Sequence, residues 1–268
     1  MKKCFSTVCC QDLNYKEIAV AAAESGINAL EVRLHQGNRL FDLADEDVER
    51  AVSYLDEKNI KIVSLGTGVG LVDYDTEVIE TAKKCVLLAS RVGAKGIRVF
   101  LGTGIKRFSE VTEYSYEGIV KALVEICAFA NCHDVEIRIE THNEFSTGKV
   151  LKALISDVGC DNLKIIWDII HPIEFGETPS ETMEYIGDRI VHVHIKDGVK
   201  KEDPDEIFYR YTKLGEGVLP IFEIVDLLEK NEYEGYYSLE WENAWKDEIK
   251  YTFSSLSEIL EHYNNFVK

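Results

Sequence analysis

Residues 163–195 read LKIIWDIIHPIEFGETPSETMEYIGDRIVHVHI. The apolar, β-branched segments 163–167 and 190–195 predict two buried strands, and residues 181–185 between them predict one or two helical turns. A strand, a helix and a second strand in succession predict a β-α-β unit, in which the two strands run parallel.

The same alternation continues along the rest of the chain. Further strands are predicted at residues 7–8, 29–32, 60–63, 97–100, 135–139 and 236–239. Apolar residues at helical spacing predict helices at residues 18–25, 48–55, 78–89, 119–130, 150–154, 221–228 and 253–260. Eight strands alternating with about eight helices in 268 residues predict an α/β fold, a (β/α)8 TIM barrel that occupies residues 1–268 as a single domain.

A doubly wound open sheet is the competing fold. That fold usually carries a glycine fingerprint directly after its first strand. Here the first predicted strand is followed by Cys9-Cys10-Gln11-Asp12, which contains no glycine. The chain has only four prolines and no low-complexity linker, which argues against a second domain.

The composition limits the partners. A net charge of −18 repels phosphate backbones and disfavours nucleic acid. No apolar run approaches the roughly 18 residues that cross a bilayer. The seven cysteines form no CxxC pair and fit reduced thiols in a cytoplasm. We therefore expect a cytoplasmic protein that acts on a small molecule, without nucleic acid or membrane partners.

Acidic residues and a histidine stand at the ends of four consecutive predicted strands. Because the carboxyl ends of barrel strands meet on one face, Glu140, Asp168, His194 and Glu240 are expected to converge. Three carboxylates would be very costly to bury together without a cation. Three oxygen donors and one nitrogen donor suit Mn²⁺, Mg²⁺ or Fe²⁺. They suit Zn²⁺ as well, but are less characteristic of it. The sequence therefore predicts one divalent metal ion at these four residues.

Neighbouring polar residues are expected around that ion. His192 shares a strand face with His194 and is expected either to pack one layer deeper or to hydrogen-bond a neighbour. His171, three residues after Asp168, is expected at the mouth of the pocket. His171 and Lys196 are both expected to contact substrate, although Lys196 pairing with Asp197 or Glu242 is the alternative.

Three further features remain open between a role in binding and a structural one. Glu31 and Arg33 lie on one strand face, where they either pair with each other or orient substrate. The glycines of residues 66–70 and 102–104 are expected in loops after strands three and four. Lys106 and Arg107 are a candidate site for a phosphate or carboxylate.

In these strand-end residues the chain resembles the xylose-isomerase-like TIM-barrel superfamily of sugar-phosphate isomerases and epimerases. The motifs that carry the resemblance are GINALEVR (26–33), ETH (140–142), DIIH (168–171), HIKD (194–197), GEG (215–217) and SLEWE (238–242). In ketose 3-epimerases of that superfamily a divalent metal is held by Glu, Asp, His and Glu. The resemblance places those roles at Glu140, Asp168, His194 and Glu240, and makes the two glutamates an acid–base pair.

The resemblance implies an isomerase or epimerase of a small sugar or sugar phosphate. Proton transfer would pass through an enediolate that the metal stabilises, with Mn²⁺ or Mg²⁺ favoured and Fe²⁺, Co²⁺ or Zn²⁺ as alternatives. Barrels of this kind often form homodimers.

The chain departs from the epimerase pattern after the metal histidine, where Lys196-Asp197 stands in place of an arginine. Dehydratases of the same superfamily, which act on keto-inositols or dehydroshikimate, resemble this stretch as well. In that alternative His142 is the candidate base. The superfamily's apurinic endonucleases need histidines after strands three and four, where this chain has Ser64-Leu65-Gly66 and Phe100-Leu101-Gly102. A non-enzymatic barrel that retains the metal cluster is a third hypothesis, which the intact set of four ligands disfavours.

Overall fold

Eight parallel strands close into a barrel in the computed structural model, which describes residues 1–34, 45–103, 113–202 and 209–267. The order around the barrel is β1-β10-β7-β6-β5-β4-β3-β2. The strands of the barrel are β1 (Lys2–Ser6), β2 (Ala29–Arg33), β3 (Lys61–Leu71), β4 (Gly96–Leu101), β5 (Glu136–Glu140), β6 (Leu163–Asp168), β7 (Ile190–Ile195) and β10 (Tyr236–Leu239). The predicted (β/α)8 TIM barrel is confirmed.

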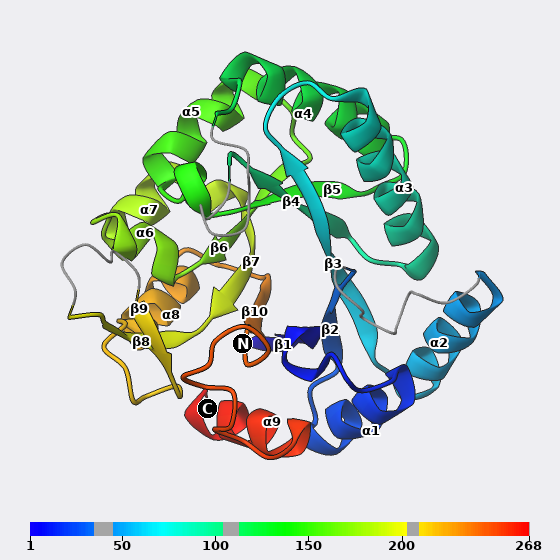
Figure 1. Cartoon of the computed structure of the whole chain (residues 1–268), viewed down its shortest axis with the longest axis vertical. Coiled ribbons are helices and arrows are strands. Elements are labelled where there is room, and N and C mark those ends of the chain that lie inside the picture. The colour runs from blue at the N-terminus through cyan, green and yellow to red at the C-terminus, as the bar shows by residue number, and fades with distance from the viewer. Residues whose placement is uncertain (35–44, 104–112, 203–208, 268) are drawn as a thin grey trace.

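Helices form a ring around these strands (Figure 1). They are α1 (Tyr15–Ser25), α2 (Asp45–Glu57), α3 (Thr76–Val92), α4 (Tyr116–Asn131), α5 (Gly148–Val158), α6 (Ile170–Glu174), α7 (Pro179–Ile186), α8 (Ile221–Lys230) and α9 (Leu256–Phe266). Within the described residues, three short 3₁₀ helices cover Thr7–Cys10, Asn143–Phe145 and Gly187–Arg189. No helix in the described part of the chain is long and apolar enough to cross a membrane.

Local sequence signals set the helix ends. The Asn14 side chain accepts hydrogen bonds from the backbone N–H groups of Lys16 and Glu17, and Glu17 accepts one from the backbone of Asn14, so α1 begins in a capping box. It ends at Gly26, whose φ of 73° is the left-handed conformation that glycine adopts without steric cost. The buried face of α1, which includes Ile18 and Ala22, packs into the apolar layer between helices and strands.

Two sequence-based boundaries are wrong. The first strand is Lys2–Ser6, whereas the predicted residues 7–8 lie in a 3₁₀ helix. Two lysines at the start of the strand hide its pattern, because only Cys4–Ser6 is fully buried. The glycines of residues 66–70 lie inside β3, where the register with β4 shifts between Gly66 and Gly70, and not in a loop after it.

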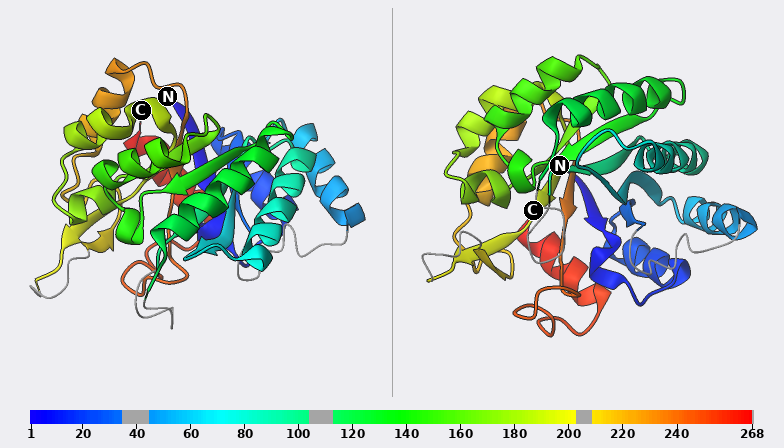
Figure 2. Two further views of the ribbon diagram at one scale, coloured as in Figure 1. Left: turned by 90° about the horizontal axis from the view of Figure 1, so that it is seen from above. Right: turned by 45° about the horizontal axis from the view of Figure 1, so that its top comes forward.

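An additional hairpin follows β7. Its strands β8 (Asp197–Lys200) and β9 (Tyr209–Thr212) pair antiparallel, and the sequence analysis did not predict them. In the left view of Figure 2 this hairpin and the segment after β10 lie at one end of the barrel, away from the N-terminus. The backbone N–H of Tyr211 donates to Glu248 at 3.3 Å and so joins the two segments. The hairpin and the segment after β10 thus lie at the end of the barrel that contains the carboxyl ends of the strands.

Candidate metal and active site

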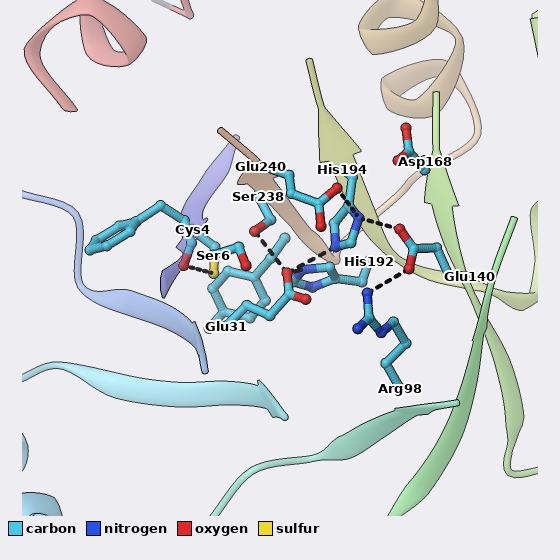
Figure 3. A network of polar contacts seen from close by, with 12 residues as sticks. Cys4, Ser6, Glu31, Arg98, Glu140, Asp168, His192, His194, Ser238 and Glu240 are labelled. Carbon is cyan, nitrogen blue, oxygen red and sulfur yellow. Dashed lines mark hydrogen bonds and ion pairs between the residues drawn. The ribbon is translucent and has the colours of Figure 1, made fainter. Parts of the chain in front are cut away.

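The four predicted ligand residues come together at the carboxyl ends of the strands. Glu140 and Asp168 are the last residues of β5 and β6, His194 is the penultimate residue of β7, and Glu240 follows β10. Asp168 and His194 are register partners across β6 and β7. One ligand atom from each of the four lies within 4.8 Å of the others, and all four side chains are buried (Figure 3).

His194 stands at the centre of this group. Its Nδ1 lies 3.0 Å from Oε1 of Glu140 and 3.2 Å from Oε2 of Glu240. Its Nε2 points the other way and lies 2.9 Å from Oε2 of Glu31. Nδ1 is therefore the nitrogen that faces the carboxylates of the cluster.

Among the residues that the structure describes, three buried cations lie around the carboxylates. Nη1 of Arg98 lies 2.7 Å from Oε2 of Glu140, and Nζ of Lys196 lies 2.7 Å from Asp168 and 2.5 Å from Glu240. Nη1 of Arg33 is more distant, 4.0 Å from Oε1 of Glu240.

These neighbours shift the proton affinities of the carboxylates. Burial by itself raises the pKa of Glu140, but Arg98 and His194 outweigh it and hold that pKa below its usual range. For Glu240 burial is likewise outweighed, here by His194 and Lys196, and the pKa is lowered. Burial dominates at Asp168 and raises its pKa despite the attraction of Lys196.

The donor set fits a divalent cation. Three carboxylate groups and one imidazole nitrogen, buried on rigid strand ends, offer the oxygen-rich coordination that Mn²⁺ and Mg²⁺ take and that Zn²⁺ also accepts. The four residues would each supply one ligand atom.

Lys196 is part of this cluster. The sequence analysis expected Lys196 to contact substrate or to pair with Asp197 or Glu242. The structure pairs Lys196 with Asp168 and Glu240, and more distantly with Glu242 at 3.4 Å. Asp197 forms no ion pair with Lys196 and instead accepts backbone hydrogen bonds, two of which come from Gly215 and Gly217.

His171 lies deeper than expected. It is buried in α6 and not at the pocket mouth, with Nδ1 2.8 Å from Glu174 and Nε2 3.4 Å from Oδ2 of Asp168. The ring of His142 meets that of His171 edge-on, with the centroids 4.6 Å apart. Burial and the neighbouring His171 lower the pKa of His142 to about 3, which leaves this ring neutral near pH 7.

Glu31 and Arg33 do not pair with each other. Glu31 accepts hydrogen bonds from His192, His194 and Ser238. Arg33 instead faces Glu240, and its Cζ lies 5.4 Å from the ring centroid of Trp245. His192 is fully buried and bonded to a neighbour, as predicted.

Arg98 and Tyr211 also lie at this site, although neither was predicted from the sequence. Arg98 lies in the middle of the apolar strand β4, and an arginine inside such a strand is the signal that could have identified it. Tyr211 of β9 has its ring centroid 5.3 Å from Nζ of Lys196, but it belongs to the hairpin that the sequence did not reveal. Lys106 and Arg107 lie outside the described residues.

Comparisons with known proteins found related sequences and barrels of the same fold. The chain is 26% identical to 3-dehydroshikimate dehydratase from Bacillus anthracis over 249 residues, and this aligned region covers 86% of each chain. It is 29% identical over 163 residues to hydroxypyruvate isomerase from Escherichia coli K12, which covers 57% of each. The crystal structure of IOLI protein with a bound zinc atom superimposes with a TM-score of 0.81, at 17% identity, over 99% of this chain and 96% of that one. The model of the family described as xylose isomerase-like TIM barrel matches residues 19–259, and the chain belongs to that family.

Proposed function

We propose that the protein is a divalent-metal-dependent isomerase or epimerase of a small sugar or sugar phosphate. The observation that carries the proposal is the placement of Glu140 and Glu240 on either side of Nδ1 of His194, at 3.0 Å and 3.2 Å. Their strands β5 and β10 lie on opposite sides of β7 in the barrel order, so the two carboxylates reach the centre from different directions.

Glu140, Asp168, His194 and Glu240 would hold the metal. A bound divalent ion polarises a carbonyl and the adjacent hydroxyl, which makes the C–H between them more acidic. The relative that was crystallised with zinc supports a metal in this fold.

Proton transfer then belongs to the two glutamates. One carboxylate removes the proton from carbon, and the other returns a proton to the opposite face of that carbon, or the proton returns to the neighbouring carbon. The first outcome inverts a centre and the second moves the carbonyl. Lys196 is paired with Glu240, and Arg98 is paired with Glu140. Both would supply positive charge beside the oxyanion that develops on the substrate.

A dehydratase is the second candidate, and Lys196 is the observation that favours it. Its ammonium lies among the ligand carboxylates, where it can protonate a departing hydroxide so that water leaves. His142, against His171, is then the candidate base that takes the proton from carbon as the C=C bond forms. The relative that matches 86% of the chain is a dehydratase.

Incubation of the Mn²⁺-loaded protein with a panel of ketoses, sugar phosphates and cyclic keto acids in D₂O tests both candidates. Carbon-bound deuterium in recovered substrate or its isomer supports the first, and a new ultraviolet-absorbing unsaturated product supports the second. The double variant Asp168→Ala/His194→Ala is the control. Product formation at an unchanged rate in that variant would overturn a metal-dependent reaction at this site.

A further inference from the structure

Glu31 lies directly beneath the four ligands. It comes from β2, its side chain is completely buried, and it belongs to neither the proposed ligand set nor the proposed acid–base pair. One oxygen, Oε2, lies 2.9 Å from Nε2 of His194, 3.1 Å from Nε2 of His192 and 3.1 Å from Oγ of Ser238 (Figure 3).

The neighbourhood is built to admit this carboxylate. The side chains near it on β1, β3 and β10 are small: Ser6, Ser64 and Ser238 are completely buried. At Gly66 a Cβ atom would stand 3.4 Å from Oε1 of Glu31 and 3.3 Å from Cδ of Arg33, a tight contact. The barrel thus leaves room for one long acidic side chain under His194.

The contact of Glu31 selects one nitrogen of the His194 ring. An ionised carboxylate only accepts hydrogen bonds, so the ring nitrogen that faces it must carry a proton. That nitrogen is Nε2, and Nδ1 is left to present its lone pair to a cation held by Glu140 and Glu240. A carboxylate on the remote nitrogen also fixes the ring orientation and increases the basicity of the ligating one.

A second metal site is conceivable at Glu31, His192 and His194, because one ligand atom from each lies within 4.8 Å of the others. The contacts favour hydrogen bonds instead. Two donors of one tetrahedral zinc ion stand about 3.3 Å apart when each bond is about 2.0–2.1 Å, whereas Oε2 lies 2.9 and 3.1 Å from the two nitrogens. Ser238 donates to the same oxygen, and His194 would have to lose both ring protons to bind two ions.

We propose that Glu31 is a positioning residue that holds the proton on Nε2 of His194 and so commits Nδ1 to the metal, without contacting metal or substrate itself. This inference rests on the proposed metal site and not on the identity of the reaction.

The test uses Zn²⁺ as the probe and protein labelled with ¹⁵N-histidine. In the zinc-loaded wild type, long-range ¹H–¹⁵N spectra are expected to show His194 protonated at Nε2 and without a proton at Nδ1. Competition with a chelator is expected to give a Zn²⁺ affinity about 10- to 100-fold weaker in Glu31→Gln, which keeps the shape but loses the charge. Ser238→Ala, which removes another donor to the same oxygen, is the matched control and stays within about threefold of wild type.

Three results would overturn the inference: a proton on Nδ1 of zinc-bound His194, a folded Glu31→Gln with wild-type affinity, or a second zinc per chain that is lost in Glu31→Gln. The readouts need no substrate, so they separate this inference from the proposed reaction. If the wild-type protein binds zinc but places no deuterium on carbon in any substrate of the panel, only the proposed reaction is contradicted.

Discussion

The ammonium group of Lys196 lies 2.7 Å from Oδ2 of Asp168, and both side chains are almost completely buried. Lys196 follows β7 and Asp168 ends β6, so this contact links neighbouring strands at the rim of the barrel. The same ammonium reaches Glu240, which makes Lys196 the cation that balances two of the proposed metal ligands. Lys196 therefore compensates charge in this cluster together with Arg98 and Arg33, and a bound metal ion would add to that compensation.

We predict about one divalent ion per chain, because four donors from one chain complete a single set of ligands. Elemental analysis after gel filtration measures it. Asp168→Ala/His194→Ala is expected to lose the ion, whereas Asp161→Ala, at a fully exposed position, keeps it. Unchanged metal in the double variant would remove this site from consideration.

Glu140→Gln and Glu240→Gln are each expected to lower kcat by several orders of magnitude while losing less metal. The amide keeps an oxygen donor but cannot take up a proton. Activity and metal content are measured together across a titration of added Mn²⁺. If excess metal restores the activity of either variant, that glutamate is a ligand and not an acid or base.

Lys196→Met is expected to destabilise the metal-free protein more than the metal-loaded one. Without the ammonium, Asp168 and Glu240 lose a buried partner that only a bound cation then replaces. The Tm measured with and without Mn²⁺ should thus differ more in the variant than in wild type. An equal or smaller difference would show that Lys196 does not compensate the ligand carboxylates.

The alanine variants of Lys196 and His171 are expected to reduce kcat/KM by about 10- to 1000-fold, the range for one donor lost from a preorganised site. Metal content is expected to stay near wild type in both, although each side chain borders Asp168. Steady-state kinetics on the substrate found in the panel, with metal analysis of the same samples, measures this. Full activity in either variant would leave that residue a structural role only.

Arg98→Met is expected to destabilise the metal-free fold by about 3–5 kcal/mol, because removing one partner leaves the buried Glu140 carboxylate uncompensated. Urea unfolding measures this loss, and Arg98→Lys, which keeps the charge, is expected to lose less. Lys95→Ala, which removes an ion pair with the exposed Asp134, is the control at about 0–1 kcal/mol. A cost below about 1 kcal/mol for Arg98→Met would contradict the charge pairing.

The barrel and the convergence of the four candidate ligands could be predicted from the sequence. Alternating strand and helix periods give the topology, and a closed parallel barrel brings every strand's carboxyl end to one rim. Glu140, Asp168, His194 and Glu240 were therefore predictable as a group, without knowledge of their distances. The hairpin of β8 and β9 was not, because its strands have only four residues each and β8 (Asp-Gly-Val-Lys) carries no strand pattern.

Which side chains pair inside the barrel was decided only by the tertiary structure. Strand alternation tells which face a residue occupies, but not which residue it meets across the interior. Arg98 and Glu140 are 42 residues apart, and Glu31 and His194 are 163 apart. Their contacts depend on barrel closure, on the register of each strand pair and on the length of each side chain. For the same reason the sequence offered only Asp197 or Glu242 as ion-pair partners of Lys196, as the alternative to substrate contact. The closed barrel pairs its ammonium with Glu242 and, at shorter distances, with Asp168 and Glu240, where the buried negative charge is concentrated.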